Sequence, residues 1–151
     1  HTPFKDDEFS ALLMVRATHH FADLPAVIKE LHRILEPGGV AVIEVANKRT
    51  LPKMFRYWFK KSKVNPFDKK PSNLKNIDKD GFYNYQPAYV EDLFRKSGFE
   101  IDNILSVSNF RSQTMKKIFK TKALVALEKK LQKPLASLRF APSIYYRLIK
   151  K

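Results

Sequence analysis

The chain has 151 residues, 44% of them hydrophobic, which is enough to build the core of one domain of ordinary size. It contains no cysteine, which excludes disulfides and thiolate metal sites and fits a reducing cytoplasm. No apolar run approaches the roughly 20 residues of a membrane-spanning helix, so the net charge of +14 is the compositional feature that needs an explanation.

The positive charge is concentrated in two segments. Residues 1–47 and 82–109 together hold 6 basic and 11 acidic side chains, whereas residues 48–81 and 110–133 hold 19 basic and 4 acidic ones. Solubility alone requires no such segregation. Three interpretations stand: a solvated charged face, an anionic membrane surface, or RNA. The membrane is favoured over RNA, because aromatic residues mixed with Lys and Arg suit the headgroup interface and no RNA-binding signature is present.

Residues 9–47 predict a strand, a helix and a second strand. The apolar run 11–15 predicts a buried strand. Asp23 is expected to cap a helix whose apolar residues recur at helical spacing up to Leu35. Pro37-Gly38-Gly39 is expected to end that helix, with a glycine taking the positive φ of a C-cap. Residues 40–45 predict the next strand, and the short connections imply a parallel sheet.

The rest of the chain predicts further elements of the same kinds. Residues 51–63 predict a short aromatic-rich helix, and residues 65–80 an exposed loop. Pro87 is expected to begin a helix that Gly98 ends, followed by a strand in which alternate residues from Phe99 to Val107 point one way. Residues 115–131 predict a helix that Pro134 ends, and residues 144–148 a last strand.

Three features of residues 9–39, in this order, are those of a known family. Phe9-Ser10 precedes the first strand, Thr18-His19-His20 follows it, and RILEPGG (33–39) closes the helix. The pattern resembles class I S-adenosylmethionine-dependent methyltransferases of type 11, which usually have Asp and Leu where this chain has Ser10 and Thr18. The resemblance implies an α/β fold with a Rossmann-like doubly wound sheet, whose last strand is antiparallel and lies between two others.

The resemblance also implies a domain organisation. The chain corresponds to the C-terminal half of one methyltransferase domain, with residues 1–47, 82–109 and 140–151 in the sheet core. Residues 48–81 and 110–139 are then two basic, mostly helical insertions that form a substrate cap. The family's glycine-rich cofactor loop belongs to the preceding half, and no GxG occurs here. We therefore expect this fragment to be inactive alone.

Ligands of a doubly wound sheet lie beyond the carboxyl ends of its strands. The resemblance implies that residues after the first strand contact the methionine part of S-adenosylmethionine: Val15, Arg16 and His20. Polar residues at other strand ends are expected to bind substrate: Asn47, Arg49, Tyr83 and Tyr85. His20 and Tyr85 are the candidate bases, although His20 has loop stabilisation as its alternative role. No spacing of His, Asp or Glu indicates a metal site.

Methyl transfer from a sulfonium is an in-line displacement, which an enzyme promotes chiefly by aligning the reactants. A conspicuous catalytic residue is therefore not required, although a base helps when the acceptor is a hydroxyl or an amine. The hypothesis is a cytoplasmic methyltransferase with a small or lipid-like acceptor, peripheral at an anionic membrane. The alternative is a non-catalytic membrane- or nucleic-acid-associated interaction domain that keeps the fold. The sequence does not name the acceptor.

Overall fold

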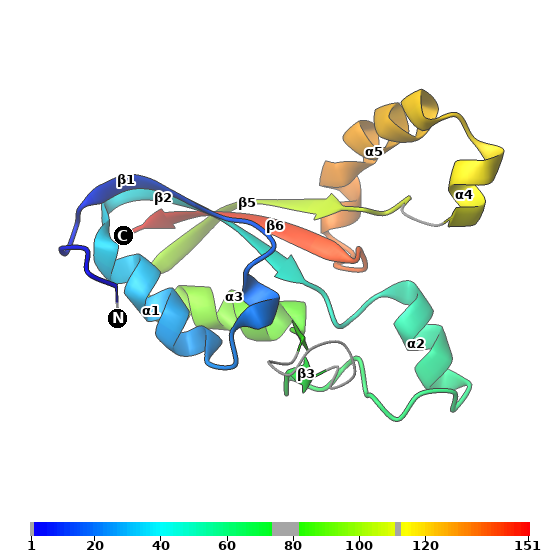
Figure 1. The fold of residues 1–151 in the computed structure, drawn as a ribbon, viewed down its shortest axis with the longest axis horizontal. Coiled ribbons are helices and arrows are strands. Elements are labelled where there is room, and N and C mark those ends of the chain that lie inside the picture. The colour runs from blue at the N-terminus through cyan, green and yellow to red at the C-terminus, as the bar shows by residue number, and fades with distance from the viewer. Residues whose placement is uncertain (1, 74–81, 111–112) are drawn as a thin grey trace.

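The computed structural model describes residues 2–73, 82–110 and 113–151, and its centre is a four-stranded sheet of order β1-β2-β6-β5. β1 is parallel to β2, and β6 is antiparallel to both β2 and β5, which confirms the partial Rossmann-like sheet with an antiparallel strand between two others (Figure 1). The four strands are Phe9–Met14 (β1), Leu35–Ala46 (β2), Phe99–Val107 (β5) and Ser143–Lys150 (β6).

Two helices cover one face of this sheet, α1 (Leu24–Ile34) and α3 (Pro87–Lys96) (Figure 1). Ile28 and Phe94 from these helices pack with Ile43 and Tyr146 of the sheet, and all four are fully buried. The other elements lie at or beyond the edge where β2 and β5 end: η1 (Thr18–His20), α2 (Leu51–Trp58), β3 (Ser72–Asn73), β4 (Tyr83–Asn84), α4 (Gln113–Ile118) and α5 (Thr121–Ala136). Among the described helices, none has the length and apolar character needed to cross a membrane.

The first helix begins as expected and ends earlier than expected. The Asp23 carboxylate accepts the N–H of Ala26 at 3.0 Å, which confirms the predicted cap. The last helical residue is Ile34, and Leu35 is already extended and pairs with Phe9 of β1. The helical conformation is disfavoured directly before a proline, here Pro37, so the chain turns to strand before the glycines. The positive φ of Gly38 (+78°) therefore belongs to an irregularity in β2, and not to a helix cap.

The first strand was expected to be buried, and this expectation is wrong. β1 is the edge strand of the described sheet, and Leu13 is 74% exposed. Leu12 and Met14 pack against the core, whereas Leu13 points to the opposite face. A strand with neighbours on one side and a helix layer on one face can bury only alternate residues, so its apolar composition alone overstated its burial.

The strand β5 also departs from its expected pattern. Ile101 pairs with Leu148 and Asn103 pairs with Arg147, so Asp102 is an extra residue in the ladder. A bulge of one residue reverses the alternation of side chains that follow it. Phe99 and Ile101 therefore face the core as expected, but beyond the bulge Ile104 faces it, and the expected Leu105 and Val107 do not.

The predicted helix over residues 115–131 is divided in the structure. α4 ends at Ile118, and α5 begins at Thr121 after the extended residue Lys120. Pro134 does not end α5, which continues to Ala136. A proline within the last turn removes one N–H from the helix, and the turn that follows it can still complete. Part of the loop predicted over residues 65–80 lies outside the described residues.

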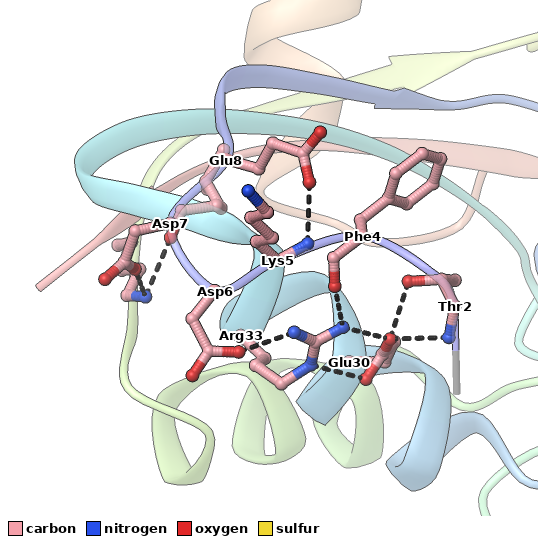
Figure 2. A network of polar contacts seen from close by, with 10 residues as sticks. Thr2, Phe4, Lys5, Asp6, Asp7, Glu8, Glu30 and Arg33 are labelled. Carbon is pink, nitrogen blue, oxygen red and sulfur yellow. Dashed lines mark hydrogen bonds and ion pairs between the residues drawn. The ribbon is translucent and has the colours of Figure 1, made fainter.

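The segment that precedes β1 is held by a polar network centred on Glu30 and Arg33 of α1 (Figure 2). The Glu30 carboxylate accepts both the backbone N–H and the hydroxyl of Thr2 at 2.7 Å. The Arg33 guanidinium donates to Glu30, to Asp6 and to the Phe4 carbonyl. Hydrogen bonds from Arg33 and then Thr2 hold the pKa of Glu30 well below its usual range. The arginine that contributed to the family resemblance thus anchors the chain leading into β1.

Two adjacent glycines test the irregularity at the start of β2. A Cβ at Gly39 would lie 2.8 Å from the Glu36 carbonyl oxygen and 2.8 Å from the buried Leu35 side chain, whereas at Gly38 it would meet no atom within 4 Å. We expect Gly39→Ala to lower the free energy of unfolding by about 2 kcal/mol or more through overpacking. Gly38→Ala should cost only about 1 kcal/mol of left-handed strain. Urea unfolding followed by circular dichroism measures both, and a larger loss at Gly38 would contradict the described backbone.

Candidate functional site

The strands β1, β2 and β5 run in the same direction, so their carboxyl ends meet at one edge of the sheet. A cavity of about 740 Å³ opens there, which we call the edge cavity. Its volume lies within the usual range for small-molecule sites. It is lined by residues that follow each of these strands, together with residues of α2, β4 and β6: Arg16, His19, His20, Glu44, Ala46, Asn47, Thr50, Lys53, Phe82, Asn84, Val107, Ser108, Pro142, Ser143 and Tyr145.

Two residues at the rim of the edge cavity have left-handed backbones. Arg16 follows β1 with φ +56°, and Ser108 follows β5 with φ +67°. Residues other than glycine seldom adopt this conformation, and such residues concentrate at functional sites. The loop after β1 is held by Glu44 of β2, whose carboxylate accepts the Arg16 N–H at 2.9 Å and whose carbonyl accepts the Thr18 hydroxyl at 2.8 Å. Arg16 is thus placed at the cavity as expected.

The two adjacent histidines also line the edge cavity, His20 as expected and His19 in addition. The His19 ring stacks on Phe82 with a centroid distance of 4.1 Å, and the His20 ring lies 4.1 Å from His19. Burial and then the neighbouring His20 lower the pKa of His19, which favours its neutral form. His20 is the more exposed ring and is therefore the better placed to meet a ligand. Val15 is exposed and does not line the cavity.

Asn47 lines the edge cavity and is almost completely buried. Its amide nitrogen donates to the carbonyls of Ala141 (2.7 Å), Arg139 (2.8 Å) and Arg49 (3.1 Å), and its amide oxygen accepts the Arg49 N–H at 2.7 Å. The side chain therefore joins the end of β2 to the loop that precedes β6. The structure gives the expected substrate residue a loop-stabilising role.

Three other expected site residues lie outside the edge cavity. Tyr85 is buried, and its hydroxyl donates to the Phe21 carbonyl at 2.5 Å. Burial raises the pKa of Tyr85, so its hydroxyl stays protonated and cannot supply the base. Tyr83 stacks on Tyr85, and the Arg49 guanidinium lies 5.0 Å from the Phe140 ring centroid. The strand-end rule placed these residues near the edge of the sheet where the cavity lies, but it did not show which way their side chains turn.

Several residues that the sequence did not single out line the edge cavity. Glu44 and Tyr145 are paired across β2 and β6, on the sheet face opposite α1 and α3. Burial and then the Glu44 charge raise the pKa of Tyr145. The ammonium of Lys53 in α2 donates to the Asn47 carbonyl at 3.0 Å, and burial and then Lys48 lower its pKa to about 8. Of these residues, only Glu44 could have been identified from the sequence, because it is a glutamate within an apolar strand. Lys53 could not, because it is one of many lysines in its segment.

A second cavity of about 590 Å³ adjoins the first, and we call it the apolar cavity. It shares Thr50, Ser108 and Pro142 with the edge cavity. Its other walls come from α2, the end of β5 and the end of α5: Leu51, Pro52, Ser106, Asn109, Phe110, Leu135, Leu138, Phe140 and Ala141. The polar side chains bond to the protein, because Ser106 donates to Asn109 and Asn109 donates to Glu128. A ligand here would meet mainly hydrocarbon. No three metal-binding side chains gather anywhere in the described ranges.

Residues 1–43 match the family described as a methyltransferase domain. The chain is 28% identical over 116 residues to a demethylmenaquinone methyltransferase of Symbiobacterium thermophilum, covering 64% of this chain and 43% of that protein. It is 49% identical over 37 residues to a sterol 24-C-methyltransferase of Aspergillus fumigatus, covering 24% and 10%. A crystal structure of a methyltransferase from Thermotoga maritima matches with TM-score 0.59 and 19% identity, over all of this chain and 60% of that one. The chain thus spans less than half the length of these curated relatives.

The buried amide of Asn47 gives a test of the site's framework. Asn47→Ala leaves carbonyls without their donor, and we expect it to lower the free energy of unfolding by about 2 kcal/mol. Asn47→Asp should cost more, because a carboxylate would face the carbonyl oxygens of Arg139 and Ala141. Asn73→Ala, at an exposed residue of β3, is the control and should change little. Urea unfolding of the three variants measures these changes. An Asn47→Asp protein as stable as the wild type would show that the amide does not hold the loop before β6.

Proposed function

The chain belongs to the class I S-adenosylmethionine-dependent methyltransferases and spans part of their length, and on that premise we propose that it transfers a methyl group to an apolar, lipid-like acceptor. One observation carries the proposal. The edge cavity, where polar and ionisable side chains gather, is continuous in its wall with the apolar cavity. An acceptor could therefore place its reacting end among polar groups and its hydrocarbon part among apolar ones.

The residues of the edge cavity suit the methyl donor, S-adenosylmethionine, which supplies an electrophilic methyl group on a sulfonium. Its amino-acid end carries a carboxylate, for which Arg16 and His20 offer donors on one wall. Its sulfonium is cationic, and the Glu44 carboxylate lies on the same wall. We expect Arg16, His20 and Glu44 to be the contribution of this chain to donor binding.

The acceptor class rests on the apolar cavity and on the relatives. The two curated relatives act, by their names, on demethylmenaquinone and on a sterol. In the displacement, the bond from the methyl carbon to sulfur breaks as the bond to the acceptor forms, and alignment supplies most of the rate enhancement. Where the acceptor loses a proton, His20 is the residue of the edge cavity that we expect to receive it.

A methyl-transfer assay tests the reaction. This chain alone is expected to be inactive, so the assays use it joined to the family's preceding half. They supply labelled S-adenosylmethionine with one of three acceptors: a demethylated quinol, a sterol or a small polar amine. We expect label in an apolar acceptor, and a slower reaction after Arg16→Ala or His20→Gln without a matching loss of thermal stability. Transfer to the amine alone would overturn the acceptor class. No transfer to any acceptor would favour the alternative, a non-catalytic interaction domain on this fold.

Filling the apolar cavity should separate acceptor binding from chemistry. Leu138 lines this cavity and is partly exposed, so Leu138→Trp can add bulk without entering the core. We expect KM for an apolar acceptor to rise about tenfold, equivalent to about 1.4 kcal/mol of lost binding, with kcat and the KM for S-adenosylmethionine unchanged. Leu127→Trp, in α5 and outside the cavity, is the matched control, since Leu127 is exposed to a similar extent as Leu138, which follows the end of that helix. An equal rise in KM for both variants would show that the acceptor does not bind in the apolar cavity.

We also propose that the protein contacts an anionic membrane peripherally. One face of α2 and the residue after it carry a stripe of exposed apolar side chains, with Trp58 57% and Phe59 69% exposed: Leu51, Phe55, Trp58 and Phe59. The exposed lysines Lys60 and Lys61 follow directly. Aromatic residues beside lysines suit the boundary between headgroups and acyl chains. α4 lies at the same end of the molecule as α2 (Figure 1). Its last residue, Ile118, is also exposed.

Cosedimentation with lipid vesicles tests this contact. We expect binding to vesicles with anionic lipid and not to neutral ones, lost at high salt because screening weakens the lysine attraction. Replacing Trp58 and Phe59 by Ser, or Lys60 and Lys61 by Glu, should reduce it severalfold. Leu13→Ser is the control, since Leu13 is at least as exposed but lies in β1 and is not part of the α2 stripe. Equal binding of both vesicle types, or an equal effect of Leu13→Ser, would contradict the proposal.

A further inference from the structure

A third, smaller cavity of about 170 Å³ lies beside the edge cavity, and we call it the cationic cavity. Lys53 and Asn84 line both, so they form the wall between them. The remaining lining comes from the end of β2, from α2 and from the segment after α2: Lys48, Arg56, Ser62, Val64, Pro66 and Ser72. Three of its residues are cationic, and among the described residues that line it none is acidic.

Lys48 is the most buried of the three cations, with only 3% of its surface exposed. Its ammonium donates to two backbone carbonyls, those of Asp68 at 2.9 Å and Lys70 at 2.6 Å. Burial lowers the pKa of Lys48, and the charge of the nearby Asp68 only partly opposes this. A buried ammonium usually has an anionic partner, because carbonyl dipoles alone offset little of its desolvation. In the described ranges no carboxylate forms an ion pair with Lys48.

Lys53 brings a second ammonium to the same cavity. Its one hydrogen bond among the described residues goes to the Asn47 carbonyl, which leaves donor capacity on the nitrogen. Burial, and after it the positive charge of Lys48, lower its pKa to about 8. Two partly desolvated like charges destabilise one another, and an anion placed between them would relieve both. Arg56 adds a guanidinium one helical turn further along α2.

Asn84 gives an observation that does not depend on charge. Its side chain is only 6% exposed, and its amide nitrogen has no hydrogen-bond partner among the described residues. A buried donor without an acceptor costs about 1–3 kcal/mol, so such groups in native proteins usually meet a water or a ligand. A ligand oxygen in the cationic cavity would supply the missing acceptor. The wall thus offers two ammonium groups, a guanidinium and an unused amide.

We infer that the cationic cavity binds a phosphate group. Its volume is that of about six water molecules, which accommodates a phosphate and not an extended polyanion. Several donors on different sides suit a tetrahedral dianion better than a planar carboxylate. The phosphate could be free in solution or belong to a lipid headgroup, since α2 supplies both this cavity, through Lys53 and Arg56, and the exposed apolar stripe. The inference does not depend on methyl transfer, because its test requires neither donor nor turnover.

Titration with inorganic phosphate, followed by calorimetry near pH 7, is the first arm of the test. We expect saturable binding with Kd of about 1 mM or tighter. Lys53→Gln should weaken it at least about tenfold, and so should Asn84→Asp, which places a carboxylate among the cations. Lys60→Gln, an exposed lysine directly after α2, is the matched control and should leave Kd unchanged. Circular dichroism confirms that each variant is folded. Phosphate should also raise the pKa of Lys53 above its value in the phosphate-free protein, as measured by NMR titration.

The second arm distinguishes the two sources of phosphate. The protein and its Lys53→Gln variant would be cosedimented with phosphatidylglycerol vesicles, with and without competing inorganic phosphate. Weaker binding by the variant, together with competition by phosphate, assigns the cavity to a lipid headgroup. Binding of inorganic phosphate without such competition assigns it to a free phosphate, and both results support the site. The inference is overturned if the folded wild-type protein binds neither inorganic phosphate nor the vesicles in a way that Lys53→Gln weakens. It is also overturned if Lys60→Gln weakens the binding of inorganic phosphate as much as Lys53→Gln does.

Discussion

A single buried amide, that of Asn47, joins the parts of this structure that make its candidate site. Asn47 lies at the end of β2, where its side chain bonds to the backbone before α2 and to the backbone before β6. Its own carbonyl accepts Lys53 of α2, and the backbone around it bridges to Tyr85. Because these bonds converge on one residue, the two segments that carry the positive charge leave the sheet at defined places. The cavities between them follow from that arrangement.

The structure explains part of the charge segregation seen in the sequence, at the sheet edge where β2 ends. The lysines and arginines of residues 48–63 are of two kinds in the structure. Lys48 and Lys53 turn inward, where burial lowers the pKa of both, whereas Lys60 and Lys61 are exposed. The inward pair lines the cationic cavity, and the exposed pair follows an apolar helix face. One basic segment can therefore serve a small anion and an anionic surface through different side chains.

The sequence predicted the sheet better than it predicted side-chain directions. The strand–helix–strand unit, the Asp23 cap and the antiparallel last strand are all present, because periodicity, capping and family pattern are local or shared signals. Arg16, His20 and Asn47 line the edge cavity because each directly follows or closely follows a strand end. Tyr85 satisfied the same rule, yet its ring packs between Tyr83 and Tyr89. The rule locates a residue, whereas packing decides its orientation.

The sequence by itself determined the α/β class, the resemblance to a methyltransferase family, the positions of most elements and the sheet edge at which the largest group of predicted site residues would lie. These properties depend on residue types and on spacings along the chain. The tertiary structure alone decided that Asp102 forms a bulge, that Lys53 is partly buried and that Asn84 lacks a partner among the described residues. Each of these depends on neighbours distant in the chain, since burial and hydrogen bonding are set by contacts that no local pattern records.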